Sequence, residues 1–347
     1  MNVKNILDFN YSDLKKYLTE NIGLEKYRTD QICDWIYKKK IFDFQEMTNL
    51  SKTDRDILTE NFQISIPYLI QKQVSKVDGT TKYLFELEDR NTVESVLIFY
   101  PNRTIACISS QVGCPLKCEF CSTGQSGFIR NLSSGEIIGQ LLAIEKVENL
   151  EINNVVYMGM GEPLLNFDNV IQSIEILNDP KMKRLGARHI TVSTAGIPHK
   201  IEELAEYKKE IRLSVSLHAP TNAQRNKIMP INHKYTIEQV VQACKIYQEK
   251  TNKRVTFEYI LIKGFNDTKE DALKLADLIG NMKAMVNLIP INENPAGFEK
   301  PSKRFIEIFL DTLIKAGIDA VVRAEKGSDI LAACGQLRLK KIGVSYK

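Results

Sequence analysis

Hydrophobic residues in the first part of the chain recur at helical spacing. Apolar side chains three or four positions apart mark residues 11–19, 27–39 and 53–61, and Asp or Ser stands near the start of each stretch. We therefore predict a small helical accessory domain over residues 1–70. Cys33 and Trp35 lie in the second of these helices and are interpreted as core residues.

From Thr80 onward the hydrophobic period changes to two, which is the period of a β-strand. Residues 81–89 and 92–100 alternate around Asp89-Arg90-Asn91, a pattern that predicts a hairpin, and residues 103–110 can form a third strand. We assign residues 71–103 to a β extension that leads into the next region. Glu94 lies in the middle of this set, and a glutamate in an alternating strand is normally on its solvent-facing side.

Strand and helix patterns then alternate along the chain. Ser133-x-x-Glu136 is a capping box that opens a helix to about residue 148. With residues 104–110 as the first strand, six β/α units follow each other, which predicts an α/β fold with a parallel sheet and a site at the carboxyl ends of its strands. We place this barrel at residues 104–325 and a C-terminal segment at residues 326–347, and the sequence leaves open whether residues 321–323 add another strand. The further predicted strands are 154–160, 189–194, 211–217, 255–261 and 285–291, and the helices between them are 168–177, 199–207, 236–250, 268–281 and 302–316.

Polar residues and glycines follow these strands where each one ends. The segment Gly159-Met160-Gly161-Glu162-Pro163 follows the second strand, and its glycines allow the backbone to approach a ligand closely. The later strand ends carry Ser193, Ser216-Leu217-His218 and Asn292. Taken singly, each of these residues could satisfy nearby backbone groups. Together, at one mouth of a barrel, they favour a ligand pocket.

Three of the seven cysteines, Cys114, Cys118 and Cys121, stand in a C-x3-C-x2-C spacing. Four thiolates would complete a structural zinc site or a fully ligated cluster, whereas three leave one coordination position open for a substrate. The spacing is that of enzymes that use S-adenosylmethionine (SAM) and a [4Fe-4S] cluster. Three core cysteines in a turn or a zinc knuckle are the alternatives, although no His or Cys follows at zinc-ligand spacing.

Cys107 and Cys334 lie outside that motif. Either could simply be packed, but Gly335 and Gln336 make a polar, flexible setting beside Cys334. Two spare cysteines in a cytosolic enzyme suggest a transient catalytic disulfide. Cys244 lies at an apolar position of a helix and is interpreted as core.

Composition indicates a cytosolic enzyme. The chain has 347 residues, of which 43% are hydrophobic and 26% charged, as in an ordinary globular protein. We find no signal peptide and no apolar run near the roughly 20 residues of a membrane helix. The net charge of +4 is mild, so RNA binding would depend on local patches.

One such patch could be formed by Lys38, Lys39 and Lys40, with Arg28 nearby. These residues are either a solvated helix end or a set of phosphate contacts.

These motifs together resemble the RlmN/Cfr family of radical SAM RNA methyltransferases, over nearly all of residues 94–337 and the helical N-terminal domain. GQSGFIRNL after the cysteines and MGMGEPL in the next loop are similar to the branch that methylates C2 of adenine. The resemblance implies a partial (β/α)6 radical-SAM barrel. It implies that Cys334 becomes S-methylated, that Cys107 is its disulfide partner and that Glu94 accepts a proton. It assigns Cys114, Cys118 and Cys121 to the cluster, and Gly161, Glu162, Ser193, Ser216, Leu217, His218 and Asn292 to SAM.

The same resemblance implies the reaction. Adenine C2 is an electron-poor carbon without a lone pair, so it cannot attack the methyl group of SAM, whereas a carbon radical can add to it. Two SAM molecules are consumed per turnover, one to methylate Cys334 and one as the radical source. The implied substrates are the adenine of 23S rRNA at the peptidyl-transferase centre and the tRNA adenine just 3′ of the anticodon.

We further expect a cytoplasmic monomer without membrane association. Its electrons would come from a donor such as flavodoxin or ferredoxin. Methylation at C8, an antibiotic-resistance activity, and a non-catalytic iron–sulfur or zinc RNA-binding protein remain the alternatives.

Overall fold

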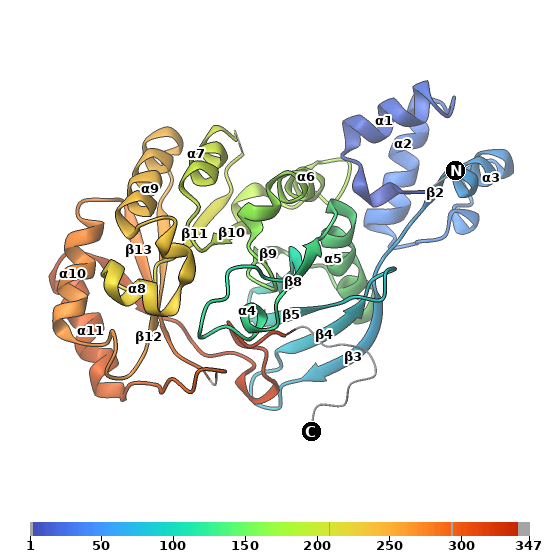
Figure 1. Cartoon of the computed structure of the whole chain (residues 1–347). Helices are drawn as coiled ribbons and strands as arrows, with labels where there is room; N and C mark the ends of the chain where they lie inside the picture. Colours follow the sequence, from blue (N-terminus) through green and yellow to red (C-terminus); the bar gives the residue numbers. More distant parts are fainter. Residues whose placement is uncertain (1–2, 208, 293, 339–347) are drawn as a thin grey trace.

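The centre of the molecule is one 10-stranded sheet with the order β14-β13-β12-β11-β10-β9-β6-β5-β4-β3 (Figure 1). The computed structural model describes residues 3–207, 209–292 and 294–338. From β6 to β14 all neighbouring strands are parallel, and from β6 to β3 they are antiparallel. The strands of this sheet are β3 (Tyr68–Val74), β4 (Thr81–Glu86), β5 (Thr92–Tyr100), β6 (Arg103–Cys107), β9 (Asn154–Tyr157), β10 (Ile190–Thr194), β11 (Arg212–Ser216), β12 (Val255–Leu261), β13 (Ala284–Pro290) and β14 (Asp319–Val322).

The predicted strand-helix alternation is confirmed. Each crossover between neighbouring parallel strands carries a helix, and the helices are α5 (Ser134–Glu148), α6 (Phe167–Asn178), α7 (Pro198–Glu206), α9 (Ile237–Thr251), α10 (Lys269–Ile279) and α11 (Lys303–Lys315). The capping box of Ser133 and Glu136 begins α5 as expected. The open question about residues 321–323 is answered by β14, which pairs in parallel with β13. Because β14 and β3 stand at opposite ends of the strand order, the barrel is partial.

The N-terminal helices are α1 (Tyr11–Glu20), α2 (Lys26–Cys33), which continues as a π-helical turn over Asp34–Lys38, and α3 (Lys52–Asn61). This part of the chain packs against the ends of α5 and α6 (Figure 1). Cys33 is buried as predicted, whereas Trp35 is only partly buried and donates its indole N–H to Asn49. Tertiary contact therefore covers one side of the second helix and leaves the other side near solvent.

The three lysines after this helix have three different roles. Lys38 pairs with Asp34, and the Lys39 ammonium lies 3.4 Å from the centre of the Trp35 ring. Lys40 turns away from solvent, because its Nζ donates to the carbonyl oxygen of Leu150 at 2.8 Å. Lys40 therefore fixes the N-terminal domain to the end of α5, and the candidate RNA patch is reduced to the other two lysines.

Several short elements were not predicted. They are the edge strand β3, the hairpin β7 (Gln111–Gly113) and β8 (Phe128–Asn131), and the helices α4 (Ser122–Gln125) and α8 (Asn222–Ile228). Apart from β3, these elements are too short to show a clear period, and α4 and β7–β8 are held by contacts with other segments instead. A parallel pair, β1 (Lys4–Asn5) and β2 (Phe62–Gln63), and short 3-10 turns complete the chain. Among the described residues, no helix has the length and apolar character needed to cross a membrane.

Candidate active site

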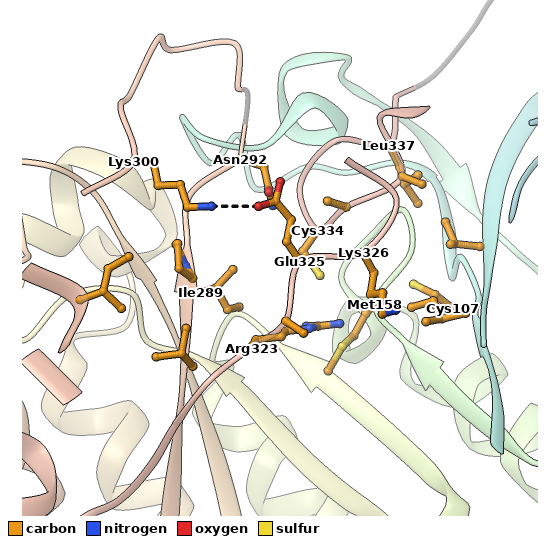
Figure 2. Close-up of a pocket in the computed structure, with 18 of the residues that line it drawn as sticks. Cys107, Met158, Ile289, Asn292, Lys300, Arg323, Glu325, Lys326, Cys334 and Leu337 are labelled. Carbon is orange, nitrogen blue, oxygen red and sulfur yellow. Dashed lines mark hydrogen bonds and ion pairs between the residues drawn. The ribbon is translucent and has the colours of Figure 1, made fainter. Parts of the chain in front are cut away.

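Two cavities lie at the carboxyl ends of the parallel strands and share part of their walls. The larger cavity has a volume of about 390 Å³ and includes Cys107, Asn292 and Cys334 (Figure 2). The smaller cavity includes the three clustered cysteines and most of the strand-end residues predicted from sequence. Met158, Ile289, Arg323 and Cys334 line both cavities.

The cysteine loop is closed by the hairpin β7–β8. Cys114 N donates to the carbonyl oxygen of Gly127 at 2.8 Å, and this close approach is possible only because Gly113 has no side chain. Gly113 has a φ of +79°, and a Cβ atom there would lie 2.0 Å from Gly127 O. Glu119 N donates to Ile228 O at 3.0 Å, which ties the loop to α8. Backbone hydrogen bonds thus hold the loop that places the three cysteines in the wall of the smaller cavity.

The thiols of this wall are poorly suited to remain charged without a cation. Burial raises the pKa of Cys114 to about 12. Burial also raises the pKa of Cys118 well above its ordinary value, with the neighbouring Cys121 and Cys114 adding to the effect. Burial likewise raises the pKa of Cys121, although backbone N–H groups of Gly124 and Thr123 oppose it. A bound iron–sulfur cluster would supply the positive charge that three crowded thiolates need, so the donor set fits such a group.

The arrangement of the three cysteines is compatible with a polynuclear cluster. Within residues 3–207, 209–292 and 294–338, no three His, Cys, Asp or Glu side chains are arranged to hold one metal ion. The cysteines instead surround a shared space beside Glu162 and His218. Ligands of a polynuclear cluster stand around a group of atoms and need not converge on one point.

The glycine-rich loop after β9 approaches the cysteine loop closely. Gly161 has a φ of +102°, and a Cβ atom there would lie 2.6 Å from Cβ of Gln111. Glu162 is buried, and its two carboxylate oxygens accept hydrogen bonds from Leu164 N at 3.0 Å and Ala195 N at 2.7 Å. Burial raises the pKa of Glu162, while these donors favour its charged form. The carboxylate is therefore held rigidly at the edge of the smaller cavity, where an ammonium group could bind it.

His218 lies in the same cavity as a neutral ring. Burial, with the nearby charge of Arg225, lowers the pKa of His218 to about 3. Its Nδ1 accepts the N–H of Ile260 at 3.2 Å, so the hydrogen of the neutral ring is on Nε2. Phe120 packs edge-on against the ring at 5.0 Å between centroids. His218 can therefore donate one hydrogen bond to a ligand at physiological pH.

The remaining predicted SAM residues are placed less uniformly. Ser193 and Ser216 line the smaller cavity, and Asn292 lines the larger one. The Oδ1 atom of Asn292 is buried and accepts no hydrogen bond from the residues that the structure describes. Leu217 lines neither cavity, because its side chain is in the core and its backbone N–H donates to Glu258 O. Any contact of Leu217 with a ligand would have to use its carbonyl oxygen.

Cys334 lies on a segment that crosses from β14 to the β extension. Ser122 N donates to Gly335 O at 2.8 Å, and the Thr123 hydroxyl donates to Leu337 O at 2.6 Å, so the segment is attached to the cysteine loop. On the other side, Lys82 donates to the carbonyl oxygen of Leu331 at 3.1 Å. These attachments place Cys334 between the two cavities. Its predicted partner Cys107 lines only the larger one.

The sequence interpretation of Glu94 as a solvent-facing residue is wrong. Residues 92–98 of β5 are all buried. Ser95 bonds to Gln140 of α5 at 2.7 Å, whereas Glu94 on the opposite face accepts Arg338 N at 3.0 Å and lies 3.6 Å from the Lys82 ammonium. Helix α5 covers one face of the strand and the C-terminal segment the other. Glu94 does not line either cavity but lies next to Val96, which lines the larger one.

Three charged residues of the site were missed in the sequence. Arg323 lines both cavities, and its pKa is raised chiefly by the Cys334 thiolate, with Glu258 and Cys107 contributing. Its position as the last residue of the uncertain strand, residues 321–323, was the available indication. Glu258 interrupts an otherwise apolar strand, which also hinted at a role. Arg225 gave no indication, because its helix is short and polar.

Comparisons with known proteins agree with this architecture. A family model described as "Radical SAM superfamily" matches residues 108–277, and one described as "Ribosomal RNA large subunit methyltransferase N-terminal domain" matches residues 4–64. A crystal structure of a radical SAM methyltransferase from Sphaerobacter thermophilus has a TM-score of 0.92 at 40% identity, covering 96% of this chain and 99% of that one.

Sequence relatives extend over the whole chain. A protein of Petrotoga mobilis named "Probable dual-specificity RNA methyltransferase RlmN" is 75% identical over 342 residues, which cover 99% of both chains. A protein of Thermotoga maritima with the same name is 56% identical over 340 residues, covering 98% of this chain and 99% of the relative. The chain therefore belongs to the RlmN family of dual-specificity RNA methyltransferases, within the radical SAM superfamily.

Proposed function

We propose that this protein methylates C2 of adenine in 23S rRNA and in tRNA, and that the new carbon passes through Cys334. Family membership implies a [4Fe-4S] cluster and SAM as cofactors, and RNA as substrate. The observation that carries the proposal is the position of Cys334, which lines both the cavity of the three clustered cysteines and the cavity of Cys107. A carbon carrier must face its methyl donor and its acceptor in turn, and Cys334 lies where it can do both.

The two cavities have different assignments in this proposal. Cys114, Cys118 and Cys121 would hold the cluster, and Gly161, Glu162, Ser193, Ser216 and His218 would hold SAM beside it. The buried Oδ1 of Asn292 would add a polar contact at the border of this site. Leu217, whose carbonyl oxygen accepts the Nε–H of Arg225, would act through the backbone between Ser216 and His218. The larger cavity would take the target nucleotide, because its volume of about 390 Å³ is in the range of small-ligand pockets, roughly 300–1,000 Å³.

The first chemical step is methylation of Cys334. Its thiolate attacks the methyl carbon of SAM, forming the carbon–sulfur bond of an S-methylcysteine and releasing S-adenosylhomocysteine. The guanidinium of Arg323 faces Cys334 closely enough for the thiolate to be the main cause of its raised pKa. Arg323 would therefore stabilise the nucleophile before the transfer.

The second step moves the carbon to RNA. When bound, the cluster supplies the electron that cleaves a second SAM into methionine and a 5′-deoxyadenosyl radical. One hydrogen atom of the methyl group on Cys334 would pass to this radical and give 5′-deoxyadenosine. The remaining methylene radical would add to C2 and tether the RNA to the protein. Glu94 would accept the C2 proton, and the adjacent Lys82 would stabilise the carboxylate before it does so. Because Glu94 is buried and lines neither cavity, the C-terminal segment that covers it would have to shift for this transfer.

Cys107 completes the reaction. As a thiolate it attacks Sγ of Cys334, which breaks the bond from sulfur to the new carbon and forms a disulfide. The released carbon takes up a proton to become the methyl group. The radical adduct must first lose one electron, which would return to the cluster that gave up one electron when SAM was cleaved. Burial raises the pKa of Cys107 to about 12, so only a small fraction of this thiol is reactive at neutral pH. A cellular dithiol must then reduce the disulfide, and a protein such as flavodoxin or ferredoxin would supply the electron for SAM cleavage.

Three single substitutions test the assigned roles. Cys334→Ala should form neither methylated protein nor methyladenine. Cys107→Ala should still accept the methyl group and react with RNA but should not release it, so a covalent protein–RNA species should accumulate on a denaturing gel. Cys244→Ala is the matched control, because that cysteine is fully buried in α9 and lines neither cavity. Normal turnover by Cys107→Ala, or a crosslink on a residue other than Cys334, would overturn the assignment.

Mass spectrometry of digested RNA from the unsubstituted enzyme then locates the methyl group. Methyl on C2 is expected, whereas methyl on C8 would show the alternative activity of the wider family. RNA that is bound but never methylated, with no SAM consumed, would indicate a binding protein instead.

A further inference from the structure

Arg225 is a buried charged residue that lines neither cavity yet contacts the loops around the smaller one. The residue is 0% exposed, although it belongs to the short helix α8 near the surface of the barrel. Its Nε donates to Leu217 O at 3.1 Å, and its Nη2 donates to Ser216 O at 3.1 Å and to Ala195 O. Its Nη1 donates to Asn232 Oδ1 at 2.9 Å, and Asn232 in turn donates to Asn222 Oδ1 and Asn226 Oδ1. The guanidinium therefore joins the end of β10 to the end of β11.

These carbonyls belong to the backbone that carries the predicted SAM ligands. Ala195 follows Ser193 by two residues, and its own N–H donates to the Glu162 carboxylate at 2.7 Å. Ser216 and Leu217 directly precede His218. A continuous chain of hydrogen bonds thus runs from Glu162 through Ala195 and Arg225 to the Ser216–His218 loop.

The charge of Arg225 has no carboxylate beside it. Burial lowers the pKa of Arg225, but only to about 10, so the residue stays protonated at neutral pH. The acidic groups that favour its charged form are the thiols of Cys118 and Cys244, and no carboxylate of the described residues acts on it. Of these two thiols, only Cys118 is a proposed cluster ligand. A buried charge without a counterion is costly, which indicates that an anion belongs nearby.

Helix α8 also contacts the cysteine loop directly. Ile228 O accepts the N–H of Glu119, the residue after Cys118. Ile228 and Met229 belong to an apolar cluster that contains Cys118, Phe120 and Ala195 and is separate from the main core. The same helix therefore supports the cysteine loop on one side and the SAM loops on the other.

We propose that Arg225 is a positioning residue of this site, which holds the two SAM loops by their carbonyls and provides the buried positive charge that balances the anionic cluster. The inference rests on the proposed function in one respect, namely that the smaller cavity holds the cluster and SAM. A cluster ligated by three thiolates carries net negative charge, and a buried cation beside it stabilises the reduced form, which is the more negative one. The rigid planar fork of arginine is needed because its donors point at three separate backbone carbonyls.

Two substitutions separate the two proposed roles of Arg225, which are to hold the SAM loops by hydrogen bonds and to supply a positive charge. Arg225→Lys keeps the positive charge, but its single ammonium group cannot bond to all three carbonyls. Arg225→Met keeps a side chain of similar length but loses both the charge and the hydrogen bonds. Lys227→Met is the matched control, because this exposed residue lies on the same helix and its loss changes the net charge by the same amount. All proteins would be reconstituted with iron and sulfide, checked by circular dichroism, and assayed without RNA for SAM affinity and for the midpoint potential of the cluster.

Both Arg225 variants should bind SAM at least about tenfold more weakly than the unsubstituted protein, because each loses charge-assisted hydrogen bonds that orient the loops. Arg225→Met should also lower the midpoint potential by at least about 59 mV, which is a tenfold change in a one-electron equilibrium. Arg225→Lys should keep the potential near that of the Lys227→Met control.

Unchanged SAM affinity in Arg225→Lys would show that Arg225 does not hold the two SAM loops in place. Equal midpoint potentials of the cluster in Arg225→Met and Lys227→Met would show that Arg225 does not balance its charge. A folded Arg225→Lys protein that takes up no iron would also contradict the proposal, because the charge is retained and the lost hydrogen bonds act on the SAM loops. None of these measurements involves RNA, so they stay informative if the RNA activity proves different. If the unsubstituted protein itself takes up no cluster, the proposed function fails and the charge-balance role of Arg225 fails with it, whereas the SAM affinities still test whether Arg225 holds the two loops.

Discussion

Replacing Gly113 by alanine should remove the cluster by moving Cys114, one of its proposed ligands. The added Cβ would lie 2.0 Å from Gly127 O, and Cβ atoms do not approach other atoms closer than 3.0 Å, so the hairpin must open by at least 1.0 Å. Opening breaks the 2.8 Å hydrogen bond from Cys114 N to Gly127 O, which is the bond that places Cys114. The positive φ of +79° adds a strain of about 1–2 kcal/mol for any L-residue with a Cβ atom.

Gly127→Ala provides the matched control. Gly127 has a φ of +87°, so alanine is strained there to a similar extent, but no atom lies within 4 Å of its added Cβ. The control should therefore lose about 1–2 kcal/mol of folding stability and keep its cluster. Gly113→Ala should lose that amount plus about 0.5–1.5 kcal/mol for the broken hydrogen bond, about 1.5–3.5 kcal/mol in all.

The assay is the iron and sulfide content of both variants after anaerobic reconstitution, with the visible absorption of the cluster and circular dichroism as checks of folding. We expect full iron content in Gly127→Ala and a large deficit in Gly113→Ala at equal helix content. If both variants bound iron equally well, the close approach of the hairpin would not be what positions Cys114, and the reasoning would be refuted.

Further expectations concern the cluster, the disulfide and the RNA. Cys118→Ala should lack both the brown chromophore and SAM cleavage, and a variant that kept a full iron complement and cleaved SAM would contradict the ligand assignment. Because burial raises the pKa of Cys107 to about 12, its thiolate fraction should grow about tenfold per pH unit below that value, so single-turnover release of methylated RNA should accelerate with rising pH; a flat profile would exclude Cys107 deprotonation as the limiting event. Lys40→Met should destabilise the protein by about 1.5–3 kcal/mol, measured by chemical unfolding, without changing SAM cleavage, because it removes a charged hydrogen bond between domains. Replacing Lys38 and Lys39 by alanine should weaken RNA binding uniformly and lower its salt slope by about 0.7–0.9 per lost phosphate contact, and an unchanged slope would show that they contact no phosphate.

Hydrophobic periodicity predicted the parallel part of the fold well, because in each β/α unit the local sequence pattern agrees with the strand or helix that forms. The strand predicted at residues 255–261 is β12 with the same bounds, and the capping box at Ser133 begins α5. Strand-end residues could be predicted as one site for the same reason, since parallel strands bring their carboxyl ends to one edge. Ser193, Ser216 and His218 do line one cavity.

Long-range contacts explain what the sequence could not show. Glu94 was taken for a solvent-facing residue because an alternating pattern normally has one wet face, but the C-terminal segment more than 200 residues away covers that face through Arg338. The roles of Arg225 and Lys40 likewise depend on carbonyl oxygens of other segments. Every residue has a backbone carbonyl oxygen, so the sequence cannot show which of them accept such hydrogen bonds. These contacts can be identified only from the structure.

The path of the C-terminal segment would explain why the proposed carbon carrier, Cys334, lies outside the barrel strands. Ser193 and Ser216, at the ends of barrel strands, line only the smaller cavity. The strand-end side chains that line both cavities, Met158, Ile289 and Arg323, carry no thiol. A segment that crosses the mouth from β14 to the β extension can present one residue to the cavities on both sides, and Cys334 is that residue. In the proposed mechanism the resolving thiol, assigned to Cys107, has to line the larger cavity alone, because a thiol facing the proposed SAM site could compete for the methyl group. Its place at the end of β6, in the larger cavity only, meets that requirement.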